Sequence, residues 1–548
     1  MAGQELIVIL SGLNLNLKQF RESGFGSLSS LMIRDDIGQL VVGARGKVLT
    51  LSLEDITKRT SEANWTVSSA DKAVCQMKGK ATKECDNFIR TLHTMEDGKM
   101  LVCGTNAFNP ACDYMTFTNG KVSLEGKKQM GRGKVPFDPY QRFASLMTGN
   151  TLYSAASSNF LGTELLFQRH GLNPLKTEMK RSWFNCKLLL HEESTGACSQ
   201  SAVCSYKLSD ISQVFSGRFM TARDTGSWDT YTGEQPIPHP GSCINDKLRA
   251  EGVMTSLDLS DKTLLFVKNH PLMEGVVTPI AGKPLLVRTG TRFSKIVVDQ
   301  VTSLDGRWHQ VMFIGTDSGW LQKAVRFDGE DGRVIEELQL FETPQFVNFL
   351  QLSSKTGQLY SGANNVAVQV NVRDCSRYIS CDDCLLARDP YCGWDKIGSQ
   401  CASVVGSLLG SMIQRLTEGD IRMCPISDVK KKPTIVHLIT GIAQFLPCSP
   451  EINLPICWRL SDNMLLPGPR HTVLSLGLII RPSYSDSGIS TCETVETVKG
   501  IVHRKTVVQY FVQVQDTSNL VRTMKAAVII LAALAFLLIL IICRKKNI

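Results

Sequence analysis

The first 370 residues repeat one pattern of apolar and polar positions. A turn residue precedes a short apolar run, the run ends in a small residue or a pair of them, and then come a second turn and a second apolar run. The first runs read GQLVVGA, GKMLVCGT, GNTLYSAA, HQVMFIGT and GQLYSGA, near Gly43, Gly104, Ala155, Gly315 and Gly362. They are rich in β-branched and aromatic residues and lack helical spacing, so they predict strands joined by turns.

The spacing of these units indicates their architecture. Successive units are separated by 61, 51, 160 and 47 residues, and periods of about 40–50 residues with several strands each are typical of propeller blades. The long interval has room for about two further units, yet it contains no clean copy. A series of unrelated β-hairpins is the alternative. The small residues that recur at the end of each run favour a true repeat, and we predict an all-β propeller.

The C-terminal end of the chain has a different pattern. Residues 526–543 form an uninterrupted run of 18 apolar or small residues, bounded by Lys525 before it and by basic residues after it. This length just spans a bilayer as a helix, and the basic tail predicts that residues 544–548 are cytoplasmic and the bulk of the chain is outside. A buried core helix and a GPI-attachment signal are the alternatives, and the basic tail favours a retained anchor.

The N-terminus carries no evident secretory signal. Residues 1–10, MAGQELIVIL, include no basic residue and only five consecutive apolar residues, whereas a signal peptide combines a basic start with an apolar stretch of about 7–15 residues. We therefore expect either a truncated or alternatively started chain, or a chain that inserts through its C-terminal segment with its bulk in the cytosol.

Composition narrows the class of protein. A length of 548 residues predicts about three or four domains, and 43% hydrophobic residues exclude wholesale disorder. The 60 basic and 51 acidic residues leave a net charge of +9, too small an excess over this length to indicate nucleic-acid binding. Eighteen cysteines are many for a reducing cytosol, so they favour an oxidising compartment.

Several tracts carry a specific resemblance. They are CQMKGKATKECDNFIR, CGTNAFNPAC, GRGKVPFDP, RDTGSWDTYTGEQPIPHPGSC, FVKNHPLM, IVVDQVTSLDG and VMFIGTDSG between residues 75 and 319, and DCSRYISCDDCLLARDPYCGWD at 374–395. The first seven are similar to the Sema domain, and the last is similar to the plexin-semaphorin-integrin (PSI) module. The chain thus resembles the semaphorin family, most of all its transmembrane class 4 members.

This resemblance implies the domain organisation. It implies a Sema-type β-propeller at 23–373, a small cysteine-rich PSI domain at 374–425 and an immunoglobulin-like (Ig-like) C2-type β-sandwich at 434–515. A transmembrane helix at 526–543 and the tail at 544–548 complete it. In the sandwich, Ser490 stands where the family has a tyrosine two residues before the second cysteine, so the tyrosine corner is expected to be lost.

The resemblance also sorts the cysteines. It implies rim bridges Cys75–Cys85 and Cys103–Cys112, and an Ig-like pair of Cys448 and Cys492 next to Trp458. The PSI framework takes Cys375, Cys381, Cys384, Cys392, Cys401 and Cys424. Zinc binding at the CxxC of Cys381 and Cys384 is the alternative, and it is disfavoured because no second CxxC or paired histidine occurs at finger spacing. No partner is assigned to Cys186, Cys198, Cys204, Cys243 or Cys457, and Cys543 is expected as a free thiol at the membrane's inner edge.

The tract at 183–204, WFNCKLLLHEESTGACSQSAVC, departs from the family. In semaphorins, much more than one blade of sequence separates the counterparts of Trp183 and Cys204, so we expect a propeller shortened near 185–201. The family closes seven blades, and blades four and five are expected to be incomplete here. The family's receptor-facing surface involves blades around this gap, so no receptor-contact residue is assigned. The shortening is also expected to affect the outer segment near the fifth blade, which helps members of the family to dimerise.

Motifs for catalysis are largely absent. The sequence has no G-x-S-x-G elbow, no phosphate loop and no H-E-x-x-H. The enzymatic alternative is a sialidase-like propeller, for which TDSGW at 316–320, with Asp317, is a single loose match that a β-turn explains. We expect no catalytic residue, metal ion, cofactor, small-molecule substrate or nucleic-acid partner. Asn64 lies in the one N-x-S/T sequon, NWT, and is a candidate glycosylation site.

The resemblance implies the function. We expect a single-pass type I plasma-membrane protein whose extracellular propeller binds plexin receptors on other cells, as a dimer through the Sema domain. Axon guidance, cell migration or immune regulation would be its setting. The main alternative is a truncated or splice-variant semaphorin with impaired folding or receptor binding. The sialidase-like enzyme is the second alternative.

Overall fold

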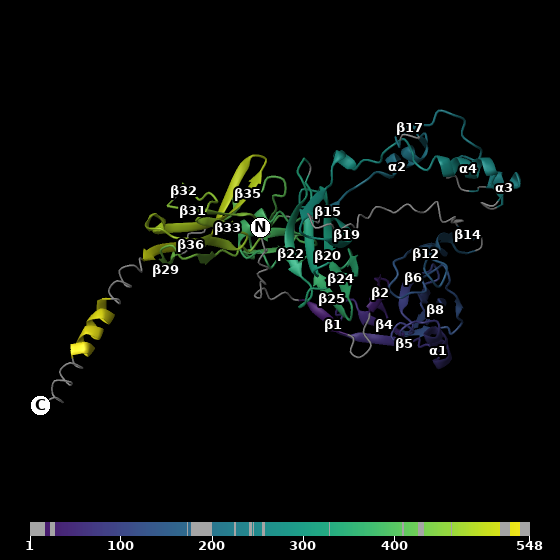
Figure 1. The fold of residues 1–548 in the computed structure, drawn as a ribbon, viewed down its shortest axis with the longest axis horizontal. Coiled ribbons are helices and arrows are strands. Elements are labelled where there is room, and N and C mark those ends of the chain that lie inside the picture. The colour runs from purple at the N-terminus through teal and green to yellow at the C-terminus, as the bar shows by residue number, and fades with distance from the viewer. Residues whose placement is uncertain are drawn as a thin grey trace.

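The structure is a computed structural model in which strands predominate (Figure 1). It describes residues 17–21, 28–171, 174–176, 200–223, 226–240, 244, 246–254, 258–327, 329–407, 410–425, 432–461, 463–515 and 526–537. The expected features at Cys186, Cys198, Cys243 and Cys543 lie outside the described residues, as does the shortened tract near 185–201 except for Gln200 and Ser201.

Five antiparallel sheets, here called the blade sheets, make up most of the N-terminal part. Each has four strands in a row, and one carries an additional strand. The strands of each sheet are given from its inner to its outer edge. The first sheet contains β2 (Leu28–Arg34), β3 (Gln39–Ala44), β4 (Lys47–Ser52) and β5 (Arg59–Asn64), and the second contains β6 (Ile89–Thr94), β7 (Met100–Gly104), β8 (Ala111–Thr118) and β10 (Gln129–Met130), with β9 (Lys121–Leu124) also paired with β8. The third contains β11 (Ala144–Thr148), β12 (Thr151–Ser157), β13 (Leu165–Arg169) and β14 (Leu175–Lys176), the fourth contains β19 (Phe293–Thr302), β20 (Trp308–Thr316), β21 (Trp320–Val325) and β22 (Arg333–Gln339), and the fifth contains β23 (Phe349–Ser353), β24 (Gln358–Ala363), β25 (Val366–Asn371) and β1 (Lys18–Arg21).

The five sequence repeats coincide with the blade sheets. Each repeated apolar run is the second strand of its sheet, namely β3, β7, β12, β20 or β24. The small residue at its end allows the next sheet to approach closely: a Cβ on Gly43 would lie 2.6 Å from the Ile89 side chain of the neighbouring sheet. At Gly104 the close neighbours lead into its own sheet: a Cβ there would collide with the Asn87 side chain and lie 3.0 Å from the Phe88 carbonyl oxygen. The prediction of a repeated β-unit is confirmed.

The blade sheets stand side by side in an arc. The inner strands pack in the order β19, β23, β2, β6 and β11, and apolar clusters fill the spaces between adjacent sheets. The strand β1 pairs antiparallel with β25, from Lys18 opposite Gln369 to Arg21 opposite Val366, so a segment before the first sheet completes the last one. This strand lies before residue 23, where the domain was expected to start. The sequence did not predict the strand, because the short run KQFR carries no repeat signature.

Two short strands stand where further blades are expected. The strands β15 (Gln200–Val203) and β18 (Leu286–Thr289) form a separate two-stranded sheet. Leu286 packs with Met312 and Ile314 of β20, and half-buried Val203 adds to this cluster. The described part of the chain therefore places only the outer portion of one blade between the sheets of β11–β14 and β19–β22.

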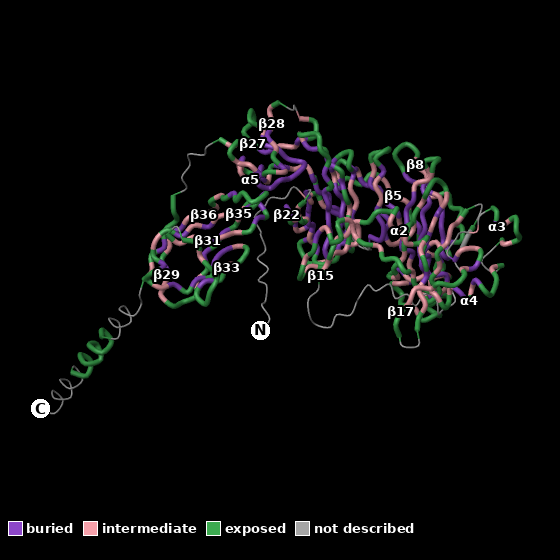
Figure 2. The backbone as a smooth tube through the Cα atoms, turned by 90° about the horizontal axis from the view of Figure 1, so that it is seen from above, coloured by how far each residue is buried: buried purple, intermediate pink, exposed green. Residues whose placement is uncertain are grey.

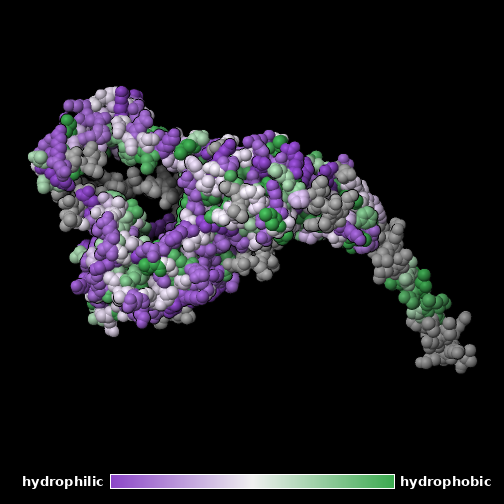
Figure 3. Space-filling model, turned by 180° about the vertical axis from the view of Figure 1, so that it is seen from behind, coloured by the Kyte–Doolittle hydropathy of each residue, from purple (hydrophilic) through white to green (hydrophobic). Residues whose placement is uncertain are grey.

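The residues between β15 and β18 form a projecting lobe, defined as residues 204–282 (Figure 1). It contains α2 (Leu208–Phe215), β16 (Met220–Ala222), β17 (Trp228–Thr230), α3 (Asp246–Ala250) and α4 (Asp261–Asn269). Its small core is aromatic: the Phe266 ring lies 5.2 Å from the rings of Phe219 and Tyr231. In the space-filling view, the molecule is hollowed between this lobe and the blade sheets (Figure 3).

A disulfide-rich module, residues 374–425, packs against the last blade sheets. It contains α5 (Cys381–Leu386) and a sheet of β26 (Cys392–Asp395), β27 (Gln400–Ser403) and β28 (Met412–Ile413). Its buried cysteines, Tyr391 and Trp394 join the same core as Val368 and Val370 of β25. The burial map shows this continuous buried layer between the module and the sheets (Figure 2).

Residues 434–515 form a β-sandwich. One sheet contains β29 (Thr434–Ile439), β36 (Ile501–Gln515), β35 (Gly488–Val498), β31 (Ile456–Leu460) and β32 (Asn463–Met464), and the other contains β30 (Gln444–Pro447), β34 (Gly477–Ile480) and β33 (His471–Leu474). Trp458 is fully buried beside the Cys448–Cys492 disulfide. The tyrosine corner was expected to be lost because Ser490 stands at its usual position. Another tyrosine, Tyr510, stacks on Trp458 with ring centres 6.1 Å apart and donates a hydrogen bond to the Pro447 oxygen (2.8 Å).

Residues 526–537 are helical and extend beyond the sandwich (Figure 1). Across the residues that the structure describes, no helix is both long enough and apolar enough to cross a membrane. Residues 538–543, the rest of the predicted span, lie outside the described residues.

Candidate interaction surfaces and the joint between the modules

The candidate enzymatic tract is a turn between two strands. Asp317 and Gly319 lie in the connection between β20 and β21, where the Trp320 amide donates a hydrogen bond to Thr316 Oγ1 (3.0 Å) and the Asp317 amide donates to the Arg292 oxygen (3.0 Å). The TDSGW tract is thus explained as the turn that connects β20 and β21. Within the described ranges, no group of three metal-ligating side chains could hold a metal ion.

A pocket opens where the inner strands of three blade sheets meet. Ile33, Val298 and Gln351 belong to its lining. Its acidic neighbours already have partners: Ser353 donates to Asp35 (2.7 Å) and Ser354 donates to Asp299 (2.5 Å). These hydrogen bonds hold the inner strands in place.

Two apolar faces border the gap between the blade sheets. On the sheet of β11–β14, Leu146 is 63% exposed and Phe167 is 52% exposed, and Tyr153 lies opposite Leu146 in the register. On the inner strand β19, Val298 is 52% exposed, and Ile296 is exposed beside it. Adjacent propeller blades normally cover such faces. The two faces therefore lie on either side of the interval in which the sequence contains no repeat copy.

A second exposed apolar surface lies on the lobe. The helix α2 buries none of its side chains, and Leu208 and Phe215 at its two ends are exposed. Asp210 lies in its first turn, which suits the positive end of the helix dipole. An amphipathic helix with exposed apolar side chains at both ends is a candidate contact surface for another chain.

A buried histidine links two blade sheets. His93 of β6 forms hydrogen bonds with Thr91 Oγ1 (2.8 Å) and with Ser145 Oγ of β11 (2.9 Å). Burial lowers the pKa of His93 to about 4. The folded protein therefore keeps this ring neutral at pH values where an unfolded chain, with an ordinary pKa of about 6.5, binds a proton.

This difference predicts acid sensitivity. As the pH falls from 7 to 4.5, the unfolded state gains a proton that folded His93 does not bind, so the free energy of unfolding should fall by about 2–3 kcal/mol. His93→Gln, which cannot titrate, should remove that part of the pH dependence. Guanidinium unfolding at both pH values measures it, with exposed His437→Gln as the control. An unchanged pH dependence in His93→Gln would contradict the prediction.

A buried ion pair joins the blade sheets to the disulfide-rich module. Lys323 of β21 pairs with Asp389 of the module, and the two side chains are only 2% and 1% exposed. The Lys323 ammonium also donates to the Val372 oxygen (3.0 Å) and lies 4.6 Å from the centre of the Tyr391 ring. Tyr378 donates to Asp389 (3.1 Å), and burial raises the pKa of Tyr378 well above its usual value.

A second cluster, here called the Arg388 joint, connects three modules. Arg388 of the disulfide-rich module donates two hydrogen bonds to Glu330 of the blade sheets (2.7 and 2.9 Å) and one to Glu496 of the sandwich (3.3 Å). Arg333 of β22 also pairs with Glu496 and donates to the Leu386 oxygen (3.1 Å). Burial lowers the pKa of Arg333.

Further contacts hold the same orientation. Lys505 of β36 pairs with Asp383 of α5, and Asn453 of the sandwich donates to the Val334 oxygen of β22 (2.8 Å). The sandwich, the disulfide-rich module and the last complete blade sheets therefore form one connected body. Sequence reasoning missed the Arg388 joint because its charged members lie far apart along the chain. For the neighbouring Lys323–Asp389 pair, a lysine inside the apolar strand LQKAVRF was the available signal.

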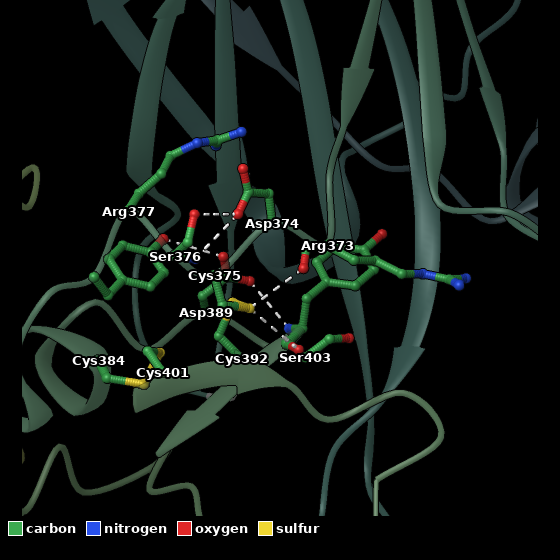
Figure 4. The surroundings of a disulfide bond; sticks show 12 residues. Arg373, Asp374, Cys375, Ser376, Arg377, Cys384, Asp389, Cys392, Cys401 and Ser403 are labelled. Carbon is green, nitrogen blue, oxygen red and sulfur yellow. Dashed lines mark hydrogen bonds between the residues drawn. A yellow bond between two sulfur atoms is a disulfide. The ribbon is translucent and has the colours of Figure 1, made fainter. Parts of the chain in front are cut away.

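The structure pairs twelve cysteines. The disulfides are Cys75–Cys85, Cys103–Cys112, Cys375–Cys392, Cys381–Cys424, Cys384–Cys401 and Cys448–Cys492. Figure 4 shows Cys375–Cys392 with Cys384–Cys401 nearby, and Ser376 donating to Asp374 at the start of the module (2.6 Å). The CxxC cysteines Cys381 and Cys384 thus bond to different partners. Among the cysteines that the structure describes, Cys204 and Cys457 are outside any disulfide.

Comparison with known families matches two parts of the chain. The Sema domain model matches residues 190–354, and the plexin repeat model matches residues 374–421. The fold resembles that of Drosophila Semaphorin 2a, with a TM-score of 0.66 at 20% identity over 91% of this chain and 98% of the other. It also resembles a chain in the structure of Drosophila Plexin A in complex with Semaphorin 1b, with a TM-score of 0.60 at 23% identity over 73% of this chain and 96% of the other.

Sequence similarity to known proteins extends over most of the chain. Human (Homo sapiens) Semaphorin-4D is 32% identical in an alignment 618 positions long that covers 91% of this chain and 71% of that protein. The disulfide-rich module coincides with the plexin repeat match and is therefore the expected PSI domain. The chain belongs to the semaphorin family, where it is similar to class 4.

Proposed function

We propose that this chain is a cell-surface ligand for plexin receptors. Membership of the semaphorin family carries the proposal, and a solved complex of Drosophila Plexin A with Semaphorin 1b, one chain of which shares this fold, supports it. In this proposal, the blade sheets form the part of the molecule that binds the receptor. Recognition at such a site rests on a few buried anchors inside a large interface.

The remaining modules form a stalk in this proposal. We assign residues 434–515 to an Ig-like domain, supported by the inter-sheet Cys448–Cys492 disulfide packed against Trp458. We assign residues 526–543 to a membrane anchor, supported by the uninterrupted apolar run. The Arg388 joint then sets the orientation of the propeller above the membrane, because it connects the blade sheets to the stalk.

We also propose that the chain forms a homodimer through the lobe. The exposed apolar side chains of α2 support this surface. Two propellers held together at a membrane would engage two receptors with a raised effective concentration. Axon guidance, cell migration or immune regulation are the proposed settings.

A co-culture experiment tests the signalling role. Cells that display the full chain are mixed with responding cells that express a plexin, and contraction of the responding cells is recorded. We expect contraction with plexin-expressing cells and none with matched plexin-null cells. A plexin-null response of equal size would reject the proposed receptor.

A shortened, non-signalling variant is the second candidate. The exposed side chains of Leu146 and Val298 favour it, because open blade edges and exposed apolar side chains promote aggregation or retention. Surface biotinylation of the expressed full chain distinguishes the candidates. Efficient labelling supports the ligand, whereas an intracellular, unlabelled pool supports the retained variant.

Glycosylation at Asn64 is a further testable expectation. Asn64 is exposed at the end of β5, and neighbouring Trp65 is buried and anchors the turn. If the blade sheets are extracellular, peptide-N-glycosidase should increase the gel mobility of the wild-type chain and leave Asn64→Gln unchanged. A wild-type chain from surface-labelled cells with no mobility shift would contradict the expectation.

A further inference from the structure

Three positively charged side chains converge on an aromatic cluster at the rim of the blade sheets. The cluster consists of Phe108, Phe137 and Phe160, with ring centres 5.5 Å apart for Phe108–Phe160 and 6.4 Å apart for Phe137–Phe160. Lys80 Nζ lies 4.5 Å from the centre of the Phe108 ring and 5.2 Å from that of Phe160.

The other two cations approach the same cluster from different segments. Lys78 Nζ lies 5.5 Å from the centre of the Phe160 ring, and the Arg132 guanidinium lies 6.0 Å from that of Phe137. Lys78 and Arg132 are exposed, and Lys80 is half-buried. We call the three cations and the three rings together the cationic rim, defined as Lys78, Lys80, Arg132, Phe108, Phe137 and Phe160.

The local fold fixes the two lysines. The helix α1 (Ser69–Met77) ends at Lys78, and Gly79 follows with φ +82°, a conformation that suits glycine at a helix C-terminus. The Lys80 amide then turns back to the Cys75 oxygen (3.4 Å), and the Cys75–Cys85 disulfide closes the loop. Both ammonium groups are thereby held over one ring, so little conformational entropy remains to be lost on binding.

The cations have no carboxylate partners in the described part of the chain. Neither lysine, nor Arg132, takes part in any ion pair there, and Lys83 in the same loop is also exposed and outside any ion pair. The nearby acids are engaged elsewhere: Asp86 pairs with Lys72 (2.5 Å), Glu84 accepts from the Ala81 amide (3.0 Å) and Glu164 accepts from Ser158 (3.1 Å). The aromatic faces attract the cations but do not neutralise them, so the rim keeps a concentrated positive charge.

We propose that the cationic rim is a binding surface for a sulfated glycosaminoglycan. Closely spaced cations match the sulfate groups repeated along such a chain, and the partly exposed Phe160 ring offers an apolar surface to a sugar face. Helix α1, which Lys78 caps, lies far from the C-terminal helix (Figure 1), and this separation favours a polysaccharide over the lipid surface next to that helix. The choice of polyanion uses the extracellular placement proposed above, but the binding test does not depend on plexin recognition.

The test compares two matched double variants of the full chain, purified in a non-ionic detergent. Lys78→Gln with Lys80→Gln removes two rim charges, and Lys262→Gln with Lys268→Gln removes two exposed charges from α4. Binding is measured on surfaces that carry heparin, as the sulfated probe, or hyaluronan, as the unsulfated one.

We expect the rim variant to bind heparin about tenfold or more weakly than the wild type, because it loses two charge-assisted contacts. The α4 variant should change the affinity less than about twofold. Phe160→Leu, which keeps every charge but removes the ring under both lysines, should weaken binding to a smaller extent than the rim variant. Raising the salt concentration should weaken the wild type more steeply than the rim variant.

Three outcomes would overturn the proposal. The first is a rim variant that binds heparin as tightly as the α4 variant. The second is wild-type binding to hyaluronan as tight as to heparin. The third is a loss of heparin binding accompanied by a lowered thermal unfolding midpoint, which would assign the lysines to folding. These outcomes are independent of whether any plexin binds.

Discussion

Lys323→Met should lower the free energy of local unfolding at the contact between β21 and the segment after α5 that carries Asp389 by about 3–5 kcal/mol. Lys323 and Asp389 are almost completely buried, and the methionine would fill the space while leaving the Asp389 carboxylate without its cation. Asp389 would keep the hydrogen bonds from Tyr378 (3.1 Å) and from the Tyr391 amide (3.0 Å). These neutral donors compensate a buried charge only in part.

Native-state hydrogen exchange at the amides of β21 and α5 measures this free energy. Lys355→Met, an exposed substitution in the turn after β23, is the matched control and should change it by less than about 0.5 kcal/mol. Adding Asp389→Asn to Lys323→Met should recover part of the loss, because no buried charge then remains. Equal exchange in Lys323→Met and Lys355→Met would show that the ion pair does not stabilise this contact.

Arg388→Met should loosen the contact of the sandwich with the blade sheets and destabilise the disulfide-rich module, again by about 3–5 kcal/mol. The Arg388 side chain is fully buried, and it donates to Glu330, to Glu496 and to the Leu416 oxygen (2.5 Å), which belong to different modules or segments. Its loss leaves the Glu330 and Glu496 carboxylates without the cation that they share, and Glu496 keeps its pair with Arg333. Repulsion between them then favours a wider range of module orientations.

Paired spin labels on β22 and β35 measure this movement as a distribution of distances. The distribution should be narrow in the wild type and broad in Arg388→Met. Arg422→Met is the control: Arg422 is 83% exposed and pairs with Asp420 (2.8 Å) at the surface, where an ion pair contributes about 0–1 kcal/mol. A narrow distribution in Arg388→Met would contradict a role for the joint in orientation.

Local patterns in the sequence predicted the blade sheets well. The apolar runs and their small end residues identified the second strand of each sheet, because burial and the close approach at Gly43 and Gly104 restrict which residues fit. The edge strand β1 was missed because an outer strand is exposed on one side and needs no apolar pattern. Among the described residues, the interval after β14 contains no complete blade before β19, in agreement with the absence of a repeat copy there.

The joints between modules could not be predicted in the same way. Glu330, Arg388 and Glu496 are ordinary charged residues in sequence, and only the folded chain brings them together. The pairing within the disulfide-rich module was also open, because Cys375, Cys381 and Cys384 bond in an interleaved order that spacing does not determine. Convergence of Lys78, Lys80 and Arg132 is likewise a property of the fold.

Saturation binding of plexin ectodomains to cells that display the full chain tests the proposed function most directly. Each plexin class is titrated, and bound receptor is normalised to the biotinylated surface amount of the chain. We predict saturable binding of at least one plexin that excess unlabelled receptor displaces. Surface display at normal levels with no plexin bound above mock-transfected cells would contradict the proposal.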